Sequence, residues 1–277
     1  MKKPKIMIPT GFGLNCDDET HYASEQAGGE VILPHLNDLY QGNVVLREAD
    51  ILVFGGGFSR GDEGGAGVVD AAYINDKLHD PIRSFIRDGG LVFGICNGFQ
   101  ILVNLGLLPG FDKNYEDREV NVTFNDSGNF RDQWVSLYFN QDSPCVFTKG
   151  TEYMNLPIRH GEGKLAAEAS VLEKLAKNKQ VAVQYCLKDS RLLADGKFPD
   201  NPNGSPFDIA GICDETGRVF GMMPHPEAYN HVCNAPDWTE KKYYLQKHHK
   251  GPINKEVRKG EGIRLFENAV KYVNETR

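Results

Sequence analysis

Two short, uninterrupted apolar runs constrain the fold of this chain more than any other feature. Residues 50–54 read DILVF and residues 91–95 read LVFGI. Such runs are typical of strands that are buried on both faces of a parallel sheet. Around them, strand-like and helix-like stretches alternate, which is the rhythm of βαβ units. We expect further strands at 5–8 and 30–33, and helices at 17–27 and after Asn37.

The second apolar run leads into a position where chemistry is expected. Asp80 before Pro81 predicts the start of a helix that ends at the glycine pair 89–90. The next run stops at Cys96, and a new helix is predicted over 97–105. The cysteine therefore lies on a strand-to-helix turn.

The second half of the chain predicts additional strands and one insertion. Strands are expected at 119–124, 134–139, 181–186, 209–213 and 219–223, a loop at 198–206 and a final amphipathic helix at 262–273. Residues 229–260 contain many Lys and His but little apolar periodicity, which indicates a surface insertion. We expect one domain over residues 1–277, an α/β fold with a doubly wound, mostly parallel, flavodoxin-like sheet, helices on both faces and additional β-strands.

Composition excludes several classes of protein. Lys and Arg number 31 against 38 Asp and Glu, a net charge of −7, which argues against binding to nucleic acid or to an anionic membrane. Six cysteines occur without any CxxC pair, so free thiols are expected and no metal site. The start of the chain does not read as a secretion signal, and no run is long enough to span a membrane. We expect a soluble, cytoplasmic protein.

The segment GICNGFQ, residues 94–100, places a thiol between a buried strand and the first turn of a helix. Open α/β sheets bind ligands at this edge. The helix dipole favours the thiolate of Cys96, and the backbone N–H of Asn97 points to where an oxyanion would form. The alternative is an inert buried cysteine, and the motif alone does not decide between the two.

The segment PHPE, residues 224–227, supplies an imidazole and a carboxylate two residues apart. In an extended backbone both side chains lie on the same side, so Glu227 can orient His225. The alternative is a loop with a solvated His and Glu. Together with Cys96, the two residues predict a nucleophilic triad.

Two glycine-containing segments accompany the triad. FGGGFSRGD, residues 54–62, follows a buried strand, and its amides can cradle an anion or face the thiol. Its glycines miss the dinucleotide-binding spacing, and no P-loop sequence occurs in the chain. RHGEGK, residues 159–164, is a polar turn that either lines a pocket or forms a simple hairpin.

These motifs resemble the class I, or triad-type, glutamine amidotransferase family, which has a G-x-C-x-G-x-Q turn followed far downstream by H-x-E. Within it, the chain is similar to the glutaminase components of phosphoribosylformylglycinamidine synthase. The similarity rests on six strings in family order: GGFSRGD, GICNGFQ, NDSGNFRDQWV, HGEGK, NPNGS and MMPHPE. It extends from residue 5 to about 228 and resumes at GIRLFENAV, so the segment between them is a departure from the family pattern.

The resemblance implies a reaction and the residues that perform it. Cys96 attacks the carboxamide of glutamine, His225 acts as base and then as acid, and Glu227 holds the imidazole. The N–H groups of Gly57 and Asn97 form the oxyanion hole. Substrate contacts are implied at four further positions: Gly56, Phe58, Gln100 and His160.

The resemblance also implies a partner. Ammonia passes to a separate synthetase subunit, which uses ATP and Mg²⁺ to convert formylglycinamide ribonucleotide to formylglycinamidine ribonucleotide. No cofactor is expected in this chain. Three alternatives stay open at this point: a glutaminase that serves another acceptor, a related cysteine peptidase or chaperone, and a non-catalytic subunit that senses glutamine or supports assembly.

Overall fold

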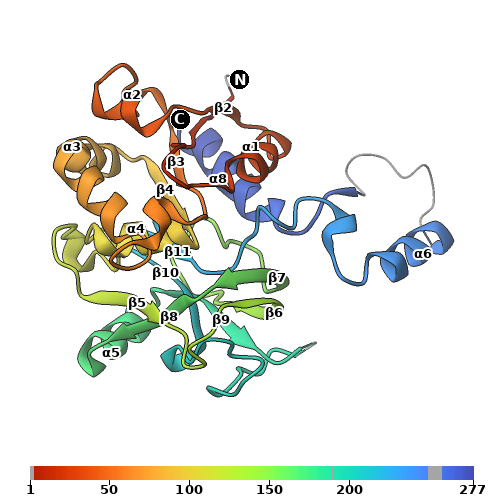
Figure 1. The fold of residues 1–277 in the computed structure, drawn as a ribbon. Helices are drawn as coiled ribbons and strands as arrows, with labels where there is room; N and C mark the ends of the chain where they lie inside the picture. Colours follow the sequence, from red (N-terminus) through yellow and green to blue (C-terminus); the bar gives the residue numbers. More distant parts are fainter. Residues whose placement is uncertain (1–2, 189, 249–257) are drawn as a thin grey trace.

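The chain folds around one large twisted sheet (Figure 1). The structure, a computed structural model, describes residues 3–188, 190–248 and 258–277. Five neighbouring strands run parallel, in the order β2 (Glu30–Ile32), β1 (Lys5–Met7), β3 (Ile51–Phe54), β4 (Leu91–Ile95) and β11 (Val219–Met222). Both β3 and β4 are fully buried, as their uninterrupted apolar sequences predict.

Antiparallel strands extend the sheet beyond β11. The order continues with β10 (Ile209–Cys213), β9 (Val181–Cys186), β6 (Arg131–Phe139) and β7 (Tyr153–His160). Two further strands, β5 (Val120–Phe124) and β8 (Glu162–Ala167), pair separately. The predicted doubly wound sheet with additional strands is confirmed.

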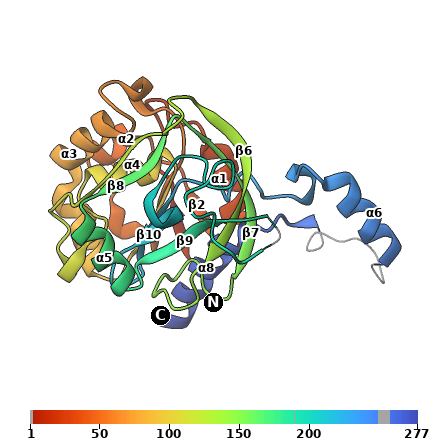
Figure 2. The same cartoon turned by 90° about the horizontal axis from the view of Figure 1, so that it is seen from below.

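Helices cover both faces of the parallel half (Figures 1 and 2). α1 (Asp17–Gln26) packs beside α8 (Ile263–Thr276) on one face, and α2 (Leu36–Tyr40), α3 (Val68–Arg87) and α4 (Asn97–Asn104) lie on the other. α5 (Ala169–Lys177) follows β8. In the described part of the chain, no helix has the length and apolar character needed to cross a membrane.

The predicted start of the third helix at Asp80 is wrong. α3 begins at Val68 and contains Pro81 in its interior. Proline removes one helical hydrogen bond, to the carbonyl of Lys77, but both residues lie on the exposed face of α3, where water can solvate that carbonyl. The buried face, with Ile74, Leu78 and other apolar side chains, stabilises the helix across the proline.

The segment RHGEGK does not form a hairpin. β7 ends at His160 and β8 begins at Glu162, but β7 pairs with β6 and β8 pairs with β5. The segment is therefore a turn between two sheets. No strand or helix was predicted between residues 139 and 181, so β7, β8 and α5 were not anticipated from the sequence.

Residues 229–260 were predicted as an insertion. Within this segment, the part that carries α6 projects from the body of the protein (Figures 1 and 2). It contains a short 3-10 turn, η5 (Val232–Asn234), and α6 (Trp238–His248), which buries none of its residues. Sequence periodicity does not predict α6, because no apolar stripe marks a buried face. Residues 249–257 of this segment lie outside the described residues, and the single-domain boundary stays a prediction.

The contact between α4 and β3 generates a stability prediction. Any Cβ at Gly98 would overlap the carbonyl oxygen of Phe54. We expect Gly98→Ala to lower the free energy of unfolding by about 1–3 kcal/mol, although Ala is the better helix former, because the overlap forces β3 and α4 apart. Urea unfolding followed by circular dichroism measures the change.

A neighbouring glycine provides the control for this measurement. A Cβ at Gly55 would meet its nearest atom, Thr20 Oγ1, at an ordinary 3.7 Å. Gly55→Ala is therefore expected to leave the unfolding free energy within about 0.5 kcal/mol of the wild type. Equal losses from the two substitutions would contradict the role assigned to the Gly98 contact.

Candidate active site

Cys96 lies on a strained turn between β4 and α4. Its backbone φ is +52°, in the left-handed region that L residues rarely adopt. Two glycines make room for this turn: Gly98 touches the carbonyl of Phe54, and a Cβ at Gly94 would lie 2.7 Å from the carbonyl oxygen of Gly98. The turn thus presents the Cys96 thiol at the carboxyl edge of the parallel strands, and the side chain is 5% exposed.

His225 and Glu227 form a buried pair just after β11. Nδ1 of His225 lies 2.5 Å from Oε1 of Glu227, and both side chains are at most 2% exposed. Nε2 of His225 has no hydrogen-bond partner among the described residues and is available to a reacting group. The predicted pairing of the two residues is therefore present in the structure.

The charges at this site favour an imidazolium. Burial alone would lower the pKa of His225, but the negative charges of Glu227 and Cys96 outweigh it and hold the pKa well above its usual value. A cationic imidazole favours the thiolate form of a neighbouring cysteine, which is the nucleophilic form.

At the two positions predicted for the oxyanion hole, Asn97 and Gly57, neither backbone N–H is needed by the local secondary structure. Asn97 begins α4, where N–H groups lack an acceptor within the helix. Gly57 has φ +144°, and its Cβ would lie 2.7 Å from the backbone of Asn15. An isolated β-bridge pairs Leu14 with Gly57. The N–H donors of this β-bridge belong to Asn15 and Phe58, so the N–H of Gly57 is not used in it. Both positions fit an oxyanion hole.

The edge strand β7 also reaches the site. The N–H of His225 donates to the carbonyl of Pro157 at 2.9 Å. The carbonyl oxygen of Arg159 lies 3.6 Å from Sγ of Cys96. The end of β7 therefore contacts both the Cys96 thiol and the backbone of His225.

The comparisons with known proteins agree with this geometry. Residues 3–273 match the family described as the CobB/CobQ-like glutamine amidotransferase domain. The chain belongs to this family. The resemblance to class I glutamine amidotransferases that the sequence motifs indicate is confirmed.

Several relatives are similar to this amidotransferase over nearly its whole length. A protein of Methanococcus maripaludis strain S2, named phosphoribosylformylglycinamidine synthase subunit PurQ, is 40% identical over 271 residues, or 98% of each chain. A protein of the same name from Dehalococcoides mccartyi is 41% identical, over 99% of this chain and all of the relative. The solved structure of PurLQS from Thermotoga maritima matches with a TM-score of 0.68 and 28% identity, over 98% of this chain and all of that chain.

Among the predicted substrate contacts, Gly56 packs against the imidazole of His225. A Cβ there would be 2.8 Å from Cε1 of His225, so the site requires glycine at this position. Phe58 is 48% exposed and stacks on Phe130, with ring centres 6.1 Å apart. This ring lies at the surface rather than among the buried groups.

Gln100 and His160 are both buried beside the amidotransferase triad. The amide of Gln100 is occupied by the protein, since Nε2 donates to the carbonyl of Glu162 and Oε1 accepts from Asn97. Burial and the charge of His225 lower the pKa of His160 to about 3, so this ring is neutral. Nδ1 of His160 pairs with Asn125, and its Nε2 has no partner in the described part of the chain.

Three polar residues near the site were not singled out from the sequence. Asp62 accepts a hydrogen bond from Nδ2 of Asn97, and Glu162 lies beside Gln100. Cys16 is half-buried against the imidazole of His225, and burial raises the pKa of its thiol. Asp62 lies in the string GGFSRGD and Glu162 in the string HGEGK. Each acid is adjacent to a glycine at the end of a helix or strand, a pattern that could have marked both residues as candidates in the sequence.

The described residues contain one group of side chains with metal-ligand geometry. Single atoms of Cys16, His225 and Glu227 lie within 4.8 Å of one another. In this amidotransferase, the His225 and Glu227 atoms hydrogen-bond to each other, which is the arrangement of a catalytic pair. All six cysteines are free, as predicted.

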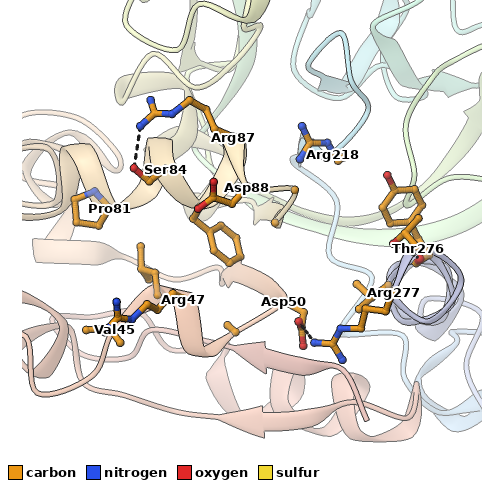
Figure 3. Close-up of a pocket in the computed structure, with 17 residues that line it drawn as sticks. Val45, Arg47, Asp50, Pro81, Ser84, Arg87, Asp88, Arg218, Thr276 and Arg277 are labelled. Atoms are coloured by element: carbon orange, nitrogen blue, oxygen red, sulfur yellow. Dashed lines mark hydrogen bonds and ion pairs between the residues drawn. The ribbon is translucent and has the colours of Figure 1, made fainter. Parts of the chain in front are cut away.

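A cavity of about 930 Å³ lies at the amino ends of the parallel strands, whereas Cys96 follows the carboxyl end of β4; Figure 3 shows the residues that line the cavity. Its wall includes Asp50, Gly90 and Arg218, which directly precede β3, β4 and β11. Arg87 and Arg277 lie at the carboxyl ends of α3 and α8, where cations offset the helix dipole. These two arginines thus have a structural explanation.

The charge balance at His225 generates a titration prediction. Replacing Glu227 by Gln removes a carboxylate that favours the imidazolium, so the pKa of His225 should fall. The pKa of His225 is higher in the folded chain than in the unfolded chain, where it is about 6.5. The imidazolium therefore stabilises the fold fully below about pH 6.5, and this contribution to the free energy of unfolding is lost as the pH rises through the raised pKa. Nuclear magnetic resonance of the imidazole nitrogens measures the pKa of His225 in the wild type and in Glu227→Gln.

His160 is the internal control in the same spectra. Its ring should stay neutral down to about pH 4 in the wild type, because its pKa is about 3. An unchanged His225 titration in Glu227→Gln would show that the carboxylate does not stabilise the imidazolium.

Proposed function

We propose that this chain is the glutaminase subunit of a phosphoribosylformylglycinamidine synthase. It hydrolyses L-glutamine to glutamate and ammonia, and a separate synthetase subunit uses the ammonia to convert formylglycinamide ribonucleotide to formylglycinamidine ribonucleotide in purine biosynthesis. The observation that carries the proposal is the buried His225–Glu227 pair beside the Cys96 turn in a member of this family. Relatives about as long as this chain carry the name of that synthase subunit.

In the proposed reaction, the Cys96 thiolate adds to the carboxamide carbon of glutamine. The resulting oxyanion accepts hydrogen bonds from the N–H groups of Asn97 and Gly57. The C–N bond then breaks while the His225 imidazolium gives its proton to the departing nitrogen, which leaves as ammonia. A γ-glutamyl thioester remains on Cys96, and Glu227 holds the imidazole throughout.

Water completes the cycle. Neutral His225 takes a proton from water as the oxygen adds to the thioester carbon, and the C–S bond breaks to release glutamate. The thiolate and the imidazolium are thereby restored. This hydrolysis needs neither ATP nor Mg²⁺, so we place both on the synthetase partner and assign no cofactor to this chain.

We also propose a cytoplasmic location and one amidotransferase domain over residues 1–277, with a surface insertion at about 229–260. Six unpaired cysteines fit a reducing compartment. The nine-stranded sheet includes strands from both halves of the chain, and α8, near the end of the chain, packs on α1, near its beginning. Both observations support a single folding unit.

The assignment of the nucleophile predicts selective labelling. A diazo-ketone analogue of glutamine should form one adduct on Cys96, and glutamine should prevent it, because the reagent must occupy the substrate pocket to react. Mass spectrometry of tryptic peptides identifies the modified residue. Exposed Cys233 is the control for simple thiol reactivity, and labelling of Cys233 instead of Cys96 in folded protein would contradict the assignment.

Because glutamine hydrolysis and the synthetase reaction lie on separate subunits, we expect the glutamine-dependent and the ammonia-dependent activities to respond differently to the loss of Cys96. In the reconstituted synthase, Cys96→Ala should abolish glutamine-dependent product formation, with a loss of at least about 10³-fold, while activity with ammonium chloride persists. Cys233→Ser, a change at an exposed site remote from the triad, should leave both activities intact. Loss of the ammonia-dependent activity in Cys96→Ala would contradict the separation of the two reactions.

A further inference from the structure

The cavity at the amino ends of the parallel strands gathers positive charge (Figure 3). Six charged side chains line it: Arg47, Arg87, Arg218, Arg277, Asp50 and Asp88. One arginine is neutralised, since Arg277 pairs with Asp50. The same carboxylate also accepts a hydrogen bond from the backbone N–H of Lys5, at 2.7 Å. Three arginines therefore remain against one carboxylate, in a chain whose net charge is −7.

The three remaining arginines bind neutral acceptors or none. Nη2 of Arg87 donates to Oγ of Ser84 at 2.8 Å, and Nη1 of Arg218 donates to the carbonyl of Ile86 at 2.8 Å. Among the residues that the structure describes, Arg47, Arg87 and Arg218 form no ion pair. A guanidinium has five N–H donors, so these contacts leave most of them to solvent or to a ligand.

The fold brings these arginines to one cavity from three separate segments. Arg47 lies in a short 3-10 turn before β3, Arg87 is the last residue of α3, and Arg218 directly precedes β11. The hydrogen bond from Arg218 to Ile86 joins positions 132 residues apart. The backbone of Arg218 is also fixed, because its carbonyl accepts from the N–H of Val92 in β4 at 2.9 Å. The sheet and α3 therefore form the cavity without a ligand.

The remaining wall and the size of the cavity fit a small organic molecule. Phe85 and Val273 are buried and Tyr272 is half-buried, and all three line the cavity. Sites for small molecules have volumes of about 300–1,000 Å³ and combine apolar walls with a few polar groups, and this cavity measures about 930 Å³. An apolar wall beside unpaired cations is suited to a ligand with an apolar part and an anionic group.

Phosphate matches the charge and the donors better than carboxylate does. A phosphate monoester carries a charge of about −1.5 to −2 at pH 7, whereas a carboxylate carries a single charge. Arginine also binds phosphate through two parallel N–H···O hydrogen bonds, because the planar guanidinium fits its oxygens. Three arginines without carboxylate partners therefore favour a phosphorylated ligand.

We propose that this cavity binds a phosphate monoester about the size of a nucleotide. Arg47, Arg87 and Arg218 hold the phosphate, and Phe85 and Tyr272 contact the organic part of the ligand. Nucleotides and sugar phosphates share this chemistry. The inference goes beyond the proposed glutaminase function and does not depend on it, because the cavity lies at the amino ends of the strands and includes no residue of the triad.

Equilibrium dialysis of the full chain tests the proposal with three probes: adenosine monophosphate, ribose phosphate and adenosine. The synthetase subunit is left out, because it binds nucleotide itself. We expect adenosine monophosphate to bind with a Kd below about 1 mM. Adenosine, which lacks the phosphate, should bind at least about 10-fold more weakly, the usual effect of losing a charge-assisted hydrogen bond. Weaker binding of ribose phosphate assigns the site to nucleotides, and equal binding assigns it to sugar phosphates.

Substitutions locate the binding in the cavity. Arg47→Gln and Arg87→Gln should each weaken the binding of the phosphorylated probes by about 10-fold or more. The side chain of Arg47 makes no hydrogen bond within the described part of the chain, so its loss leaves the fold intact, which circular dichroism checks. The matched control is Arg264→Gln, which removes the same charge from an exposed arginine outside the cavity. It should change the Kd by less than about twofold, because solvent and salt screen distant surface charges.

Three results would overturn the proposal. The first is that neither phosphorylated probe binds to the wild type at about 1 mM. The second is that adenosine binds as tightly as adenosine monophosphate, since the phosphate then contributes nothing. The third is an equal loss of binding in Arg47→Gln and Arg264→Gln, which would reflect a general attraction of anions to surface arginines rather than a site in the cavity.

Discussion

The site depends on the curvature of the nine-stranded sheet. β7 is the fifth strand along from β4, so in a flat sheet the two would lie about 24 Å apart. Yet the carbonyl of Arg159, in β7, lies 3.6 Å from the thiol that follows β4. Twist and curvature bring the antiparallel half back over the carboxyl edge of the parallel half. The parallel strands therefore present the nucleophile, and the antiparallel strands enclose it.

Backbone contacts set the finer geometry at that edge. Gly98 allows α4 to touch the end of β3, and Gly56 allows the loop after β3 to touch the imidazole of His225. Neither approach leaves space for a Cβ. Close contacts of the main chain thus bring the reacting groups within hydrogen-bond reach of one another. A main chain in a fixed fold also holds its N–H donors in fixed directions.

Sequence patterns predict the parts of this structure that depend on local order. The parallel strands, the Cys96 turn and the His225–Glu227 pair follow from apolar runs and residue spacing, and all three are present. The patterns do not predict helices whose bounds depend on which of their faces is buried. The helix predicted to start at Asp80 begins at Val68 instead, because α3 tolerates Pro81 on its solvated face. α6 was not predicted, because it has no buried face to mark it. Asp62 and Glu162 meet only through tertiary contacts, which a single sequence does not show.

The charges around His225 also account for its change of role in the proposed reaction. The raised pKa depends in part on the negative charge of Cys96. Once the sulfur is acylated, that charge is gone, while Glu227 and burial remain. The pKa of His225 must therefore fall after the first step, by the amount that the thiolate contributed. The imidazolium becomes a neutral imidazole when its proton goes to the departing nitrogen, and the lower pKa then keeps it neutral, the form that can take a proton from water.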